Sequence, residues 1–94
     1  MNTKTIGLIN QLKPILDDAL FLNGRTKNWG NQMSLLGNVP ELDSIAVMNV
    51  VSALEVNFNI FIEDDDINAE VFATLESLAN LIYAKTNNPL VIAR

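Results

Sequence analysis

Cysteine and histidine are both absent from this chain of 94 residues. Without cysteine there is no disulfide, no thiolate nucleophile and no zinc site with thiolate ligands. Without histidine, a serine triad, an imidazole acid or base and a histidine-ligated metal all lack their central residue. These absences argue against an enzyme, and a reactive serine in this chain would depend on another protein for its activation.

Basic residues are scarce: 6 Lys and Arg against 11 Asp and Glu give a formal net charge of −5. This is the wrong sign for neutralising the phosphates of DNA or RNA, so we expect basic partner proteins and no nucleic acid. No apolar run approaches the ~18–20 residues that span a bilayer, and the first residues show no signal-peptide cleavage pattern. We therefore expect a cytoplasmic monomer without stable membrane insertion.

Apolar residues recur at helical spacing and no strand-like alternation appears, which predicts an all-α fold. We expect a single domain over residues 1–94, with a core of about 4–86 and a tail of 87–94. The first helix is predicted between Thr3 and Leu22. Its apolar stripe consists of Ile9, Leu12, Leu16 and Leu20.

Pro14 interrupts this first helix in one of two ways. Proline removes one helical hydrogen bond, so either the helix is kinked near Asn10 or its regular part starts close to Lys13. The pair Asn23-Gly24 is typical of a helix end. The polar loop that follows has apolar residues that we expect to hold it against the core: Trp29, Met33, Leu35 and Leu36.

Three further helices are predicted downstream. The second runs from about Ser44 to Asn57 and is apolar over a broad surface rather than a narrow stripe. A brief helix is predicted from the acidic run 63–66 to about Phe72, and a last helix, capped by Thr74, ends near Lys85. The expected architecture is a four-helix bundle with three longer helices and one short helix.

The acidic run 63–66 also invites comparison with a calcium loop. Asp64, Asp66 and Asn68 occupy alternate positions, as ligands do in an EF-hand. The loop would need glycine where Ala69 stands and a bidentate glutamate where Leu75 stands. We therefore predict no specific metal site.

Ser44 is the candidate for chemical modification, because it lies at the predicted start of the second helix. Unpaired amides and the partial positive charge of a helix start suit a covalently attached phosphate. Asp43 can serve as the N-cap of the same helix. Asp-Ser at a helix start is also ordinary capping chemistry, so the dipeptide alone does not distinguish a modification site from a cap.

A longer stretch around Ser44 resembles the acyl carrier protein family. The similar segments are Leu35-Leu36-Gly37-Asn38-Val39-Pro40-Glu41-Leu42-Asp43-Ser44-Ile45-Ala46-Val47 and Ser52-Ala53-Leu54-Glu55-Val56-Asn57-Phe58. The resemblance covers about residues 35–85. It implies that Ser44 receives 4′-phosphopantetheine from coenzyme A through a phosphopantetheinyl transferase, and that the thiol of this arm carries acyl groups as thioesters.

The resemblance also implies an acyl pocket and a partner surface. Candidate residues for the pocket are Met48, Val51, Leu54, Ile62 and Phe72. The candidate surface for an acyl-activating ligase or acyltransferase consists of Ile45, Val47, Val50, Glu55 and Val56. Some of the apolar residues of the second helix should face solvent or a partner, because a domain this small cannot bury every side of one helix.

Two departures from the family pattern favour a specialised bacterial pathway. The family usually has glycine directly before Asp-Ser, where this chain has Leu42, and the longer motif is similar to carriers associated with exosortase and exopolysaccharide systems. The second helix also has a single acidic residue, Glu55, where the family usually exposes several. We expect partners that are less driven by charge.

Two alternatives remain open. A peptidyl or aminoacyl carrier would be modified at Ser44 but loaded with an amino acid. A non-covalent helical interaction module would use the apolar second helix and leave Ser44 unmodified.

Overall fold

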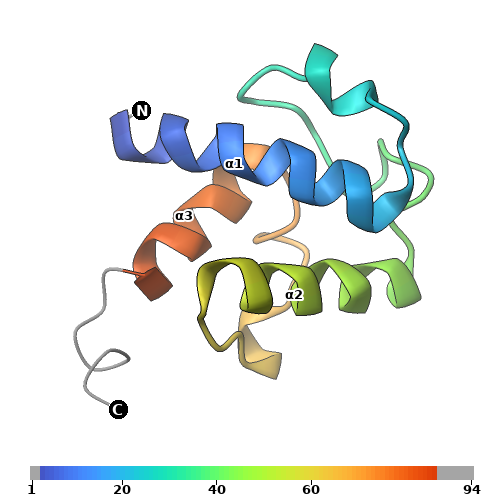
Figure 1. Cartoon of the computed structure of the whole chain (residues 1–94). Coiled ribbons are helices and arrows are strands. Elements are labelled where there is room, and N and C mark those ends of the chain that lie inside the picture. The colour runs from blue at the N-terminus through green and yellow to red at the C-terminus, as the bar shows by residue number, and fades with distance from the viewer. Residues whose placement is uncertain (1–2, 87–94) are drawn as a thin grey trace.

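The computed structural model describes residues 3–86, which form three α-helices and two short 3₁₀-helices without a strand (Figure 1). The α-helices are α1 (Thr3–Leu20), α2 (Ser44–Phe58) and α3 (Leu75–Thr86), and the 3₁₀-helices are η1 (Arg25–Asn28) and η2 (Asp64–Asp66). The all-α prediction is confirmed for this part of the chain. The predicted tail, 87–94, lies outside the described residues. None of the helices between residues 3 and 86 has the length and apolar character needed to cross a membrane.

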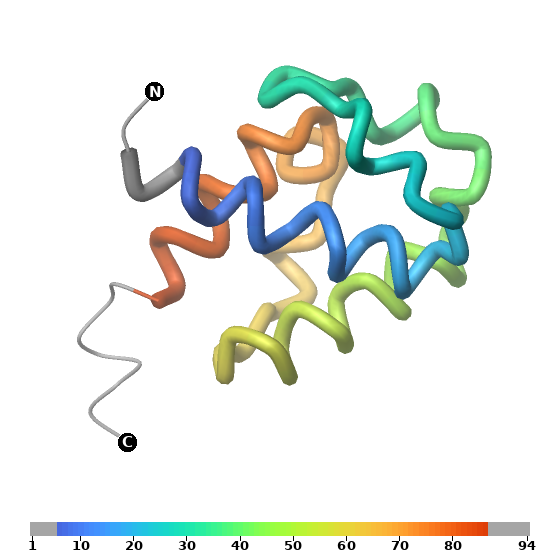
Figure 2. The backbone as a smooth tube through the Cα atoms, turned by 45° about the horizontal axis from the view of Figure 1, so that its top comes forward, coloured from blue at the N-terminus to red at the C-terminus, as the bar shows by residue number. Residues whose placement is uncertain are grey.

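The core is built around α1, which packs against both α2 and α3 (Figure 1, Figure 2). The predicted stripe of α1 is buried over its whole length, and burial of each large aliphatic side chain contributes roughly 1.5–3 kcal/mol. The spacing of these residues therefore fixes which side of α1 faces the other two helices. The buried side chains of the three helices are Ile9, Leu12, Leu16, Leu20, Val50, Val51, Leu54, Leu75, Leu78, Ala79 and Ile82.

Pro14 lies inside α1, which continues through it. The alternative in which the regular helix starts near Lys13 is therefore wrong. Proline cannot donate a hydrogen bond to the carbonyl of Asn10, but both residues are exposed, so water can reach that carbonyl. The burial of Leu12 and Leu16 on the same helix offsets the missing hydrogen bond.

α1 ends at Leu20 because Phe21 adopts the left-handed conformation, with φ of 57°. The N–H of Leu22 then donates to the carbonyl of Asp17 at 2.9 Å, a hydrogen bond typical of helix C-termini. The predicted stop at Asn23-Gly24 comes after the actual end of the helix. These two residues, both with positive φ, form the turn into η1 instead.

The Asp17 carboxylate holds this turn in place. It accepts hydrogen bonds from the N–H of Gly24 and the hydroxyl of Thr26, each at 2.9 Å, and Thr26 is buried. The Gly24 N–H has the largest effect on the pKa of Asp17 and lowers it, and this lowering outweighs the opposing effect of desolvation. The turn between α1 and η1 is therefore fixed by an ionised side chain.

A hydrogen-bonded junction joins residues 33–36, which precede α2, to residues 72–75, which lead into α3. Its hydrogen bonds run from Leu35 N to Ala73 O (2.8 Å), Leu36 N to Phe72 O (3.1 Å) and Leu75 N to Met33 O (3.0 Å). We call it the 33–36/72–75 junction. Anchoring of the preceding loop is confirmed for Leu35, which is buried, and for Trp29 and Met33, which pack partly against the core. Leu36 is instead exposed.

In place of the predicted short helix up to Phe72, the structure has the single 3₁₀ turn η2, followed by irregular turns. Both ends of this segment are held by other contacts. The Asp66 carboxylate bonds to Lys85 Nζ of α3 at 2.7 Å, which lowers the pKa of Asp66, and Phe72 belongs to the 33–36/72–75 junction. These contacts, and not helix propensity, set the path of residues 67–73.

Candidate functional site

Ser44 is the first residue of α2, and Asp43 is the N-cap of that helix. Asp43 Oδ1 accepts a hydrogen bond from the N–H of Ala46 at 2.8 Å, and the carbonyl of Asp43 accepts one from Val47 at 2.8 Å. Ser44 is exposed, and its hydroxyl makes no hydrogen bond with any residue between 3 and 86. The cap therefore does not use the serine side chain.

The surroundings of Ser44 favour a negative group but do not activate the hydroxyl. The amides of Ser44 and Ile45 precede the first helical hydrogen bond, which is donated by Val47, and they lie at the positive end of the helix dipole. The carboxylate of Asp43 is engaged by the Ala46 amide and makes no hydrogen bond with the Ser44 hydroxyl. The site can present an oxygen nucleophile, but a base must come from elsewhere.

The loop that leads to Ser44 is anchored on both sides of a turn. Gly37 adopts a positive φ of 83°, and the N–H of Val39 donates to the carbonyl of Leu35 at 2.9 Å. Val39 and Leu42 are buried, which leaves the following Asp43 and Ser44 at the surface. Ser44 is thus held at a fixed corner of the fold.

An apolar hollow of about 290 Å³ opens beside Ser44. Its lining residues are Leu36, Ser44, Val47, Met48, Ile67, Asn68, Ala69 and Phe72. It lies between the first half of α2 and the segment before α3, and the 33–36/72–75 junction joins two of its walls. The attachment candidate and an apolar cavity are therefore adjacent.

The candidate acyl-pocket residues divide into two groups. Met48 and Phe72 line the hollow beside Ser44. Val51, Leu54 and Ile62 belong to the buried core and do not line it. The sequence-based list omitted the other apolar lining residues: Leu36, Val47, Ile67 and Ala69. An apolar residue directly after an acidic run was the available signal for Ile67, and an apolar residue directly before Gly37 was the signal for Leu36.

The candidate partner surface is also divided by the structure. Ile45 and Val56 are exposed, and Val47 is half-buried. Val50 is fully buried, so its placement on an accessible surface was wrong; it contributes to the core that α2 shares with α1. Glu55 is half-buried and its carboxylate accepts a hydrogen bond from the N–H of Ile62 at 2.8 Å, which fixes the turn after α2.

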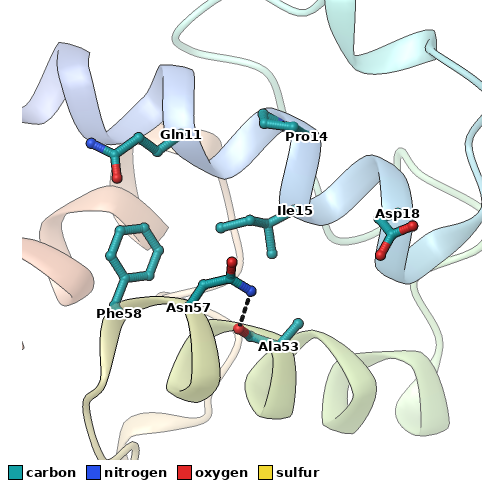
Figure 3. A pocket seen from close by; sticks show the side chains of 7 residues that line it. All are labelled: Gln11, Pro14, Ile15, Asp18, Ala53, Asn57 and Phe58. Carbon is teal, nitrogen blue, oxygen red and sulfur yellow. Dashed lines mark hydrogen bonds between the residues drawn. The ribbon is translucent and has the colours of Figure 1, made fainter.

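A second hollow, of about 450 Å³, lies between α1 and α2 (Figure 3). It is lined by Gln11, Pro14, Ile15, Asp18, Ala53, Asn57 and Phe58. The Asn57 amide donates to the carbonyl of Ala53 within α2 at 2.7 Å, as the dashed line in Figure 3 shows. Neither Ser44 nor any of the predicted site residues lines this hollow, so we assign it no part in the candidate site.

Among known proteins, a match is found with a solved structure. The chain is similar to a holo acyl carrier protein from Nitrosomonas europaea, solved by solution NMR, with 44% sequence identity and a TM-score of 0.75. The match covers 80% of this chain and 90% of that chain. No family model and no curated protein matches the sequence. Identity at this level over most of both chains shows that the protein belongs to the acyl carrier protein family, whose members are carriers rather than enzymes.

Proposed function

We propose that this protein holds acyl groups as thioesters on a 4′-phosphopantetheine arm attached to Ser44, and delivers them to partner enzymes. The observation that carries the proposal is the exposed Ser44 hydroxyl at the start of α2, which is free of hydrogen bonds to residues 3–86. The similar solved protein is a holo carrier, which supports the same modified state here. The proposed compartment is the cytoplasm, where coenzyme A is made.

The residues around Ser44 fit a phosphodiester. The unpaired amides of Ser44 and Ile45 and the helix dipole would hold its negative charge, while Asp43 keeps the cap through its bond to Ala46 at 2.8 Å. When bound, the arm supplies the thiol that carries the acyl group, a group that this cysteine-free chain lacks. The protein would then position the arm without reacting itself.

Loading needs a phosphopantetheinyl transferase, because the chain offers no base to Ser44. The Ser44 oxygen would form a bond to the phosphorus that bears the pantetheine in coenzyme A, while the bond from that phosphorus to the departing adenosine 3′,5′-bisphosphate breaks. The proton of the hydroxyl passes to a base of the transferase. Asp43 caps α2 through Oδ1, and no hydrogen bond joins its carboxylate to the Ser44 hydroxyl.

We further propose that the hollow beside Ser44 accepts the near part of the acyl chain. Its volume is about 290 Å³ and its walls include Leu36, Met48 and Phe72. An apolar lining favours an acyl cargo over an aminoacyl one, since the charged ammonium of an amino acid would lose hydration there. This distinguishes the proposal from the peptidyl carrier alternative.

The partner enzymes are proposed to be a dedicated acyl-activating ligase or acyltransferase in a specialised pathway. The only acidic side chain within α2 is Glu55, and its carboxylate is already bonded to the Ile62 amide. Exposed apolar residues at both ends of α2, Ile45 and Val56, would supply contact area instead. Such partners should depend less on salt than partners recognised by rows of carboxylates.

The test of attachment uses a broad-range phosphopantetheinyl transferase with coenzyme A and Mg²⁺. Intact mass spectrometry should show one added phosphopantetheine, and peptide mapping should place it on Ser44. Ser44→Ala should remain unmodified, whereas the control Ser52→Ala, an exposed serine of the same helix, should load like the wild type. An unmodified wild-type protein, or a modified Ser44→Ala, would refute the proposal.

A second experiment tests the cargo and the pathway. Holo-protein should accept acyl groups from an acyl-activating ligase and should be a poor substrate for adenylating enzymes that load amino acids. Transfer rates measured across an ionic-strength series should change little with salt. Rapid, strongly salt-sensitive use by generic fatty-acid synthase enzymes would contradict the specialised pathway.

A further inference from the structure

Phe21 combines two unusual properties. Its φ of 57° lies in the left-handed region, which bulky side chains rarely adopt and where Gly or Asn usually ends a helix. The Leu22–Asp17 hydrogen bond and the burial of Leu22 hold this conformation, whereas the Phe21 side chain is 83% exposed and does not contribute to it. A large aromatic side chain that the fold does not bury is available for a contact outside the fold.

Ile45 lies close to Phe21 and directly follows Ser44. It is 77% exposed, and both side chains line one hollow of about 390 Å³ between the end of α1 and the start of α2. Figure 1 and Figure 2 both show these two helix ends side by side. We call this the Phe21–Ile45 surface. It lies on a different side of Ser44 from the proposed acyl hollow, with which it shares no lining residue.

Two acidic residues, Glu41 and Asp43, also line the hollow of the Phe21–Ile45 surface. Glu41 Oε2 pairs with Arg25, but Glu41 Oε1 is buried and has no hydrogen-bond partner among the described residues. Glu41 therefore offers a partner no accessible, unpaired oxygen. The surface is thus complementary to an apolar side chain of a partner, supplied by Phe21 and Ile45.

The position of this surface selects one class of partner. Enzymes that act on the end of a flexible arm can contact α2 at various places within reach of that arm, and they need not cover the residues beside Ser44. An enzyme that modifies the Ser44 oxygen itself must bring its active site to bonding distance of that oxygen. A specific interface covers roughly 800 Å² on each partner, so the residues next to Ser44 must lie within it.

We propose that the Phe21–Ile45 surface is a docking site for the phosphopantetheinyl transferase, with Phe21 as the anchoring aromatic residue. The inference rests on the proposed attachment of phosphopantetheine at Ser44. Aromatic residues in the centre of an interface often carry much of the binding energy, whereas the residues around them contribute little. Phe21 would therefore determine how well the transferase binds and would leave the chemical step unchanged.

The experiment compares Phe21→Asn with Phe61→Asn in steady-state loading by a broad-range transferase. Phe61 is a matched control, since it is 67% exposed and lies beyond the other end of α2. We expect Phe21→Asn to raise KM about tenfold or more with kcat unchanged, as for loss of an interface anchor. Phe61→Asn should leave both constants within about twofold of the wild type.

Stability measurements separate docking from a structural role. Asparagine tolerates the left-handed conformation better than phenylalanine, so Phe21→Asn should unfold at a urea concentration no lower than the wild type. A clearly lower midpoint would overturn the proposal, because the fold itself would then need Phe21.

The outcomes distinguish this inference from the proposed function. Normal loading of the wild type together with equal KM values for Phe21→Asn and Phe61→Asn would overturn the docking site and leave Ser44 as the attachment site. A wild-type protein that no transferase loads would overturn both.

Discussion

Leu54→Ala should lower the free energy of unfolding by about 3–4 kcal/mol. Leu54 lies in the middle of α2 and is fully buried, with 0% of its surface exposed. The substitution removes three carbon groups, each contributing about 0.8 kcal/mol when buried, which gives about 2.4 kcal/mol. The cavity left behind adds the rest, because a close-packed core relaxes only partly. Leu and Ala have similar helix propensities, so the helix itself contributes little.

The free energy of unfolding is measured by urea denaturation. Unfolding is monitored by far-UV circular dichroism and by the fluorescence of Trp29, the single tryptophan. A loss of about 3 kcal/mol corresponds to a midpoint about 2 M lower if the m-value is about 1.5 kcal/mol/M. At 4–8 °C for each kcal/mol in a domain of this size, Tm should fall by about 12 °C or more.

Val56→Ala is the matched control for Leu54→Ala, since Val56 lies two residues further along α2 and is 81% exposed. Its effect should stay within about 0.5 kcal/mol, as for other surface substitutions. If Leu54→Ala lost less than about 1 kcal/mol, or no more than Val56→Ala, the placement of Leu54 in a close-packed core would be refuted.

Two further predictions concern ionisable side chains. Asp43→Ala should destabilise the fold by about 0.5–2 kcal/mol in urea, and Asp43→Asn by much less, because Asn also caps helices; equal effects would show that the Ala46 hydrogen bond is unimportant. The pKa values of Asp17 and Asp66 are lowered by the Gly24 N–H and by Lys85, respectively, from an ordinary value of 3.8. Their contribution to stability is therefore present above about pH 4 and lost as pH falls through the lower pKa values of the folded state. Tm should fall from pH 5 to pH 2. The fall should be smaller in Asp17→Asn, which lacks one of the two groups. An equal fall of Tm in that variant would contradict the contribution of Asp17.

The sequence predicts which residues are buried most accurately where only one side of a helix faces the core. In α1 the apolar residues form a narrow stripe, so their burial follows from the spacing alone. The N-cap of α2 was also predictable, because an aspartate before a helix has one common role, and Asp43 has it. The position of Ser44 at the surface follows from that cap.

Prediction failed where contacts between distant parts of the chain decide the outcome. α2 is apolar on most sides, so its sequence could not show that Val50 is buried while Val56 is exposed. The end of α1 was missed because Phe21, rather than a glycine, takes the left-handed conformation. The segment before α3 is held by Asp66–Lys85 and by the 33–36/72–75 junction, and neither contact leaves a local pattern in the sequence.

Because of the 33–36/72–75 junction, the size of the proposed acyl hollow can change without loss of the contacts that hold its walls together. The Leu36 amide bonds to the carbonyl of Phe72, so two walls of the hollow are joined through main-chain atoms, which every amino acid other than proline can provide. Side chains at these positions can therefore change in volume while the walls stay connected. Under the proposed function, selection or a small library at Leu36 and Met48 would therefore alter cargo length without redesign of the fold.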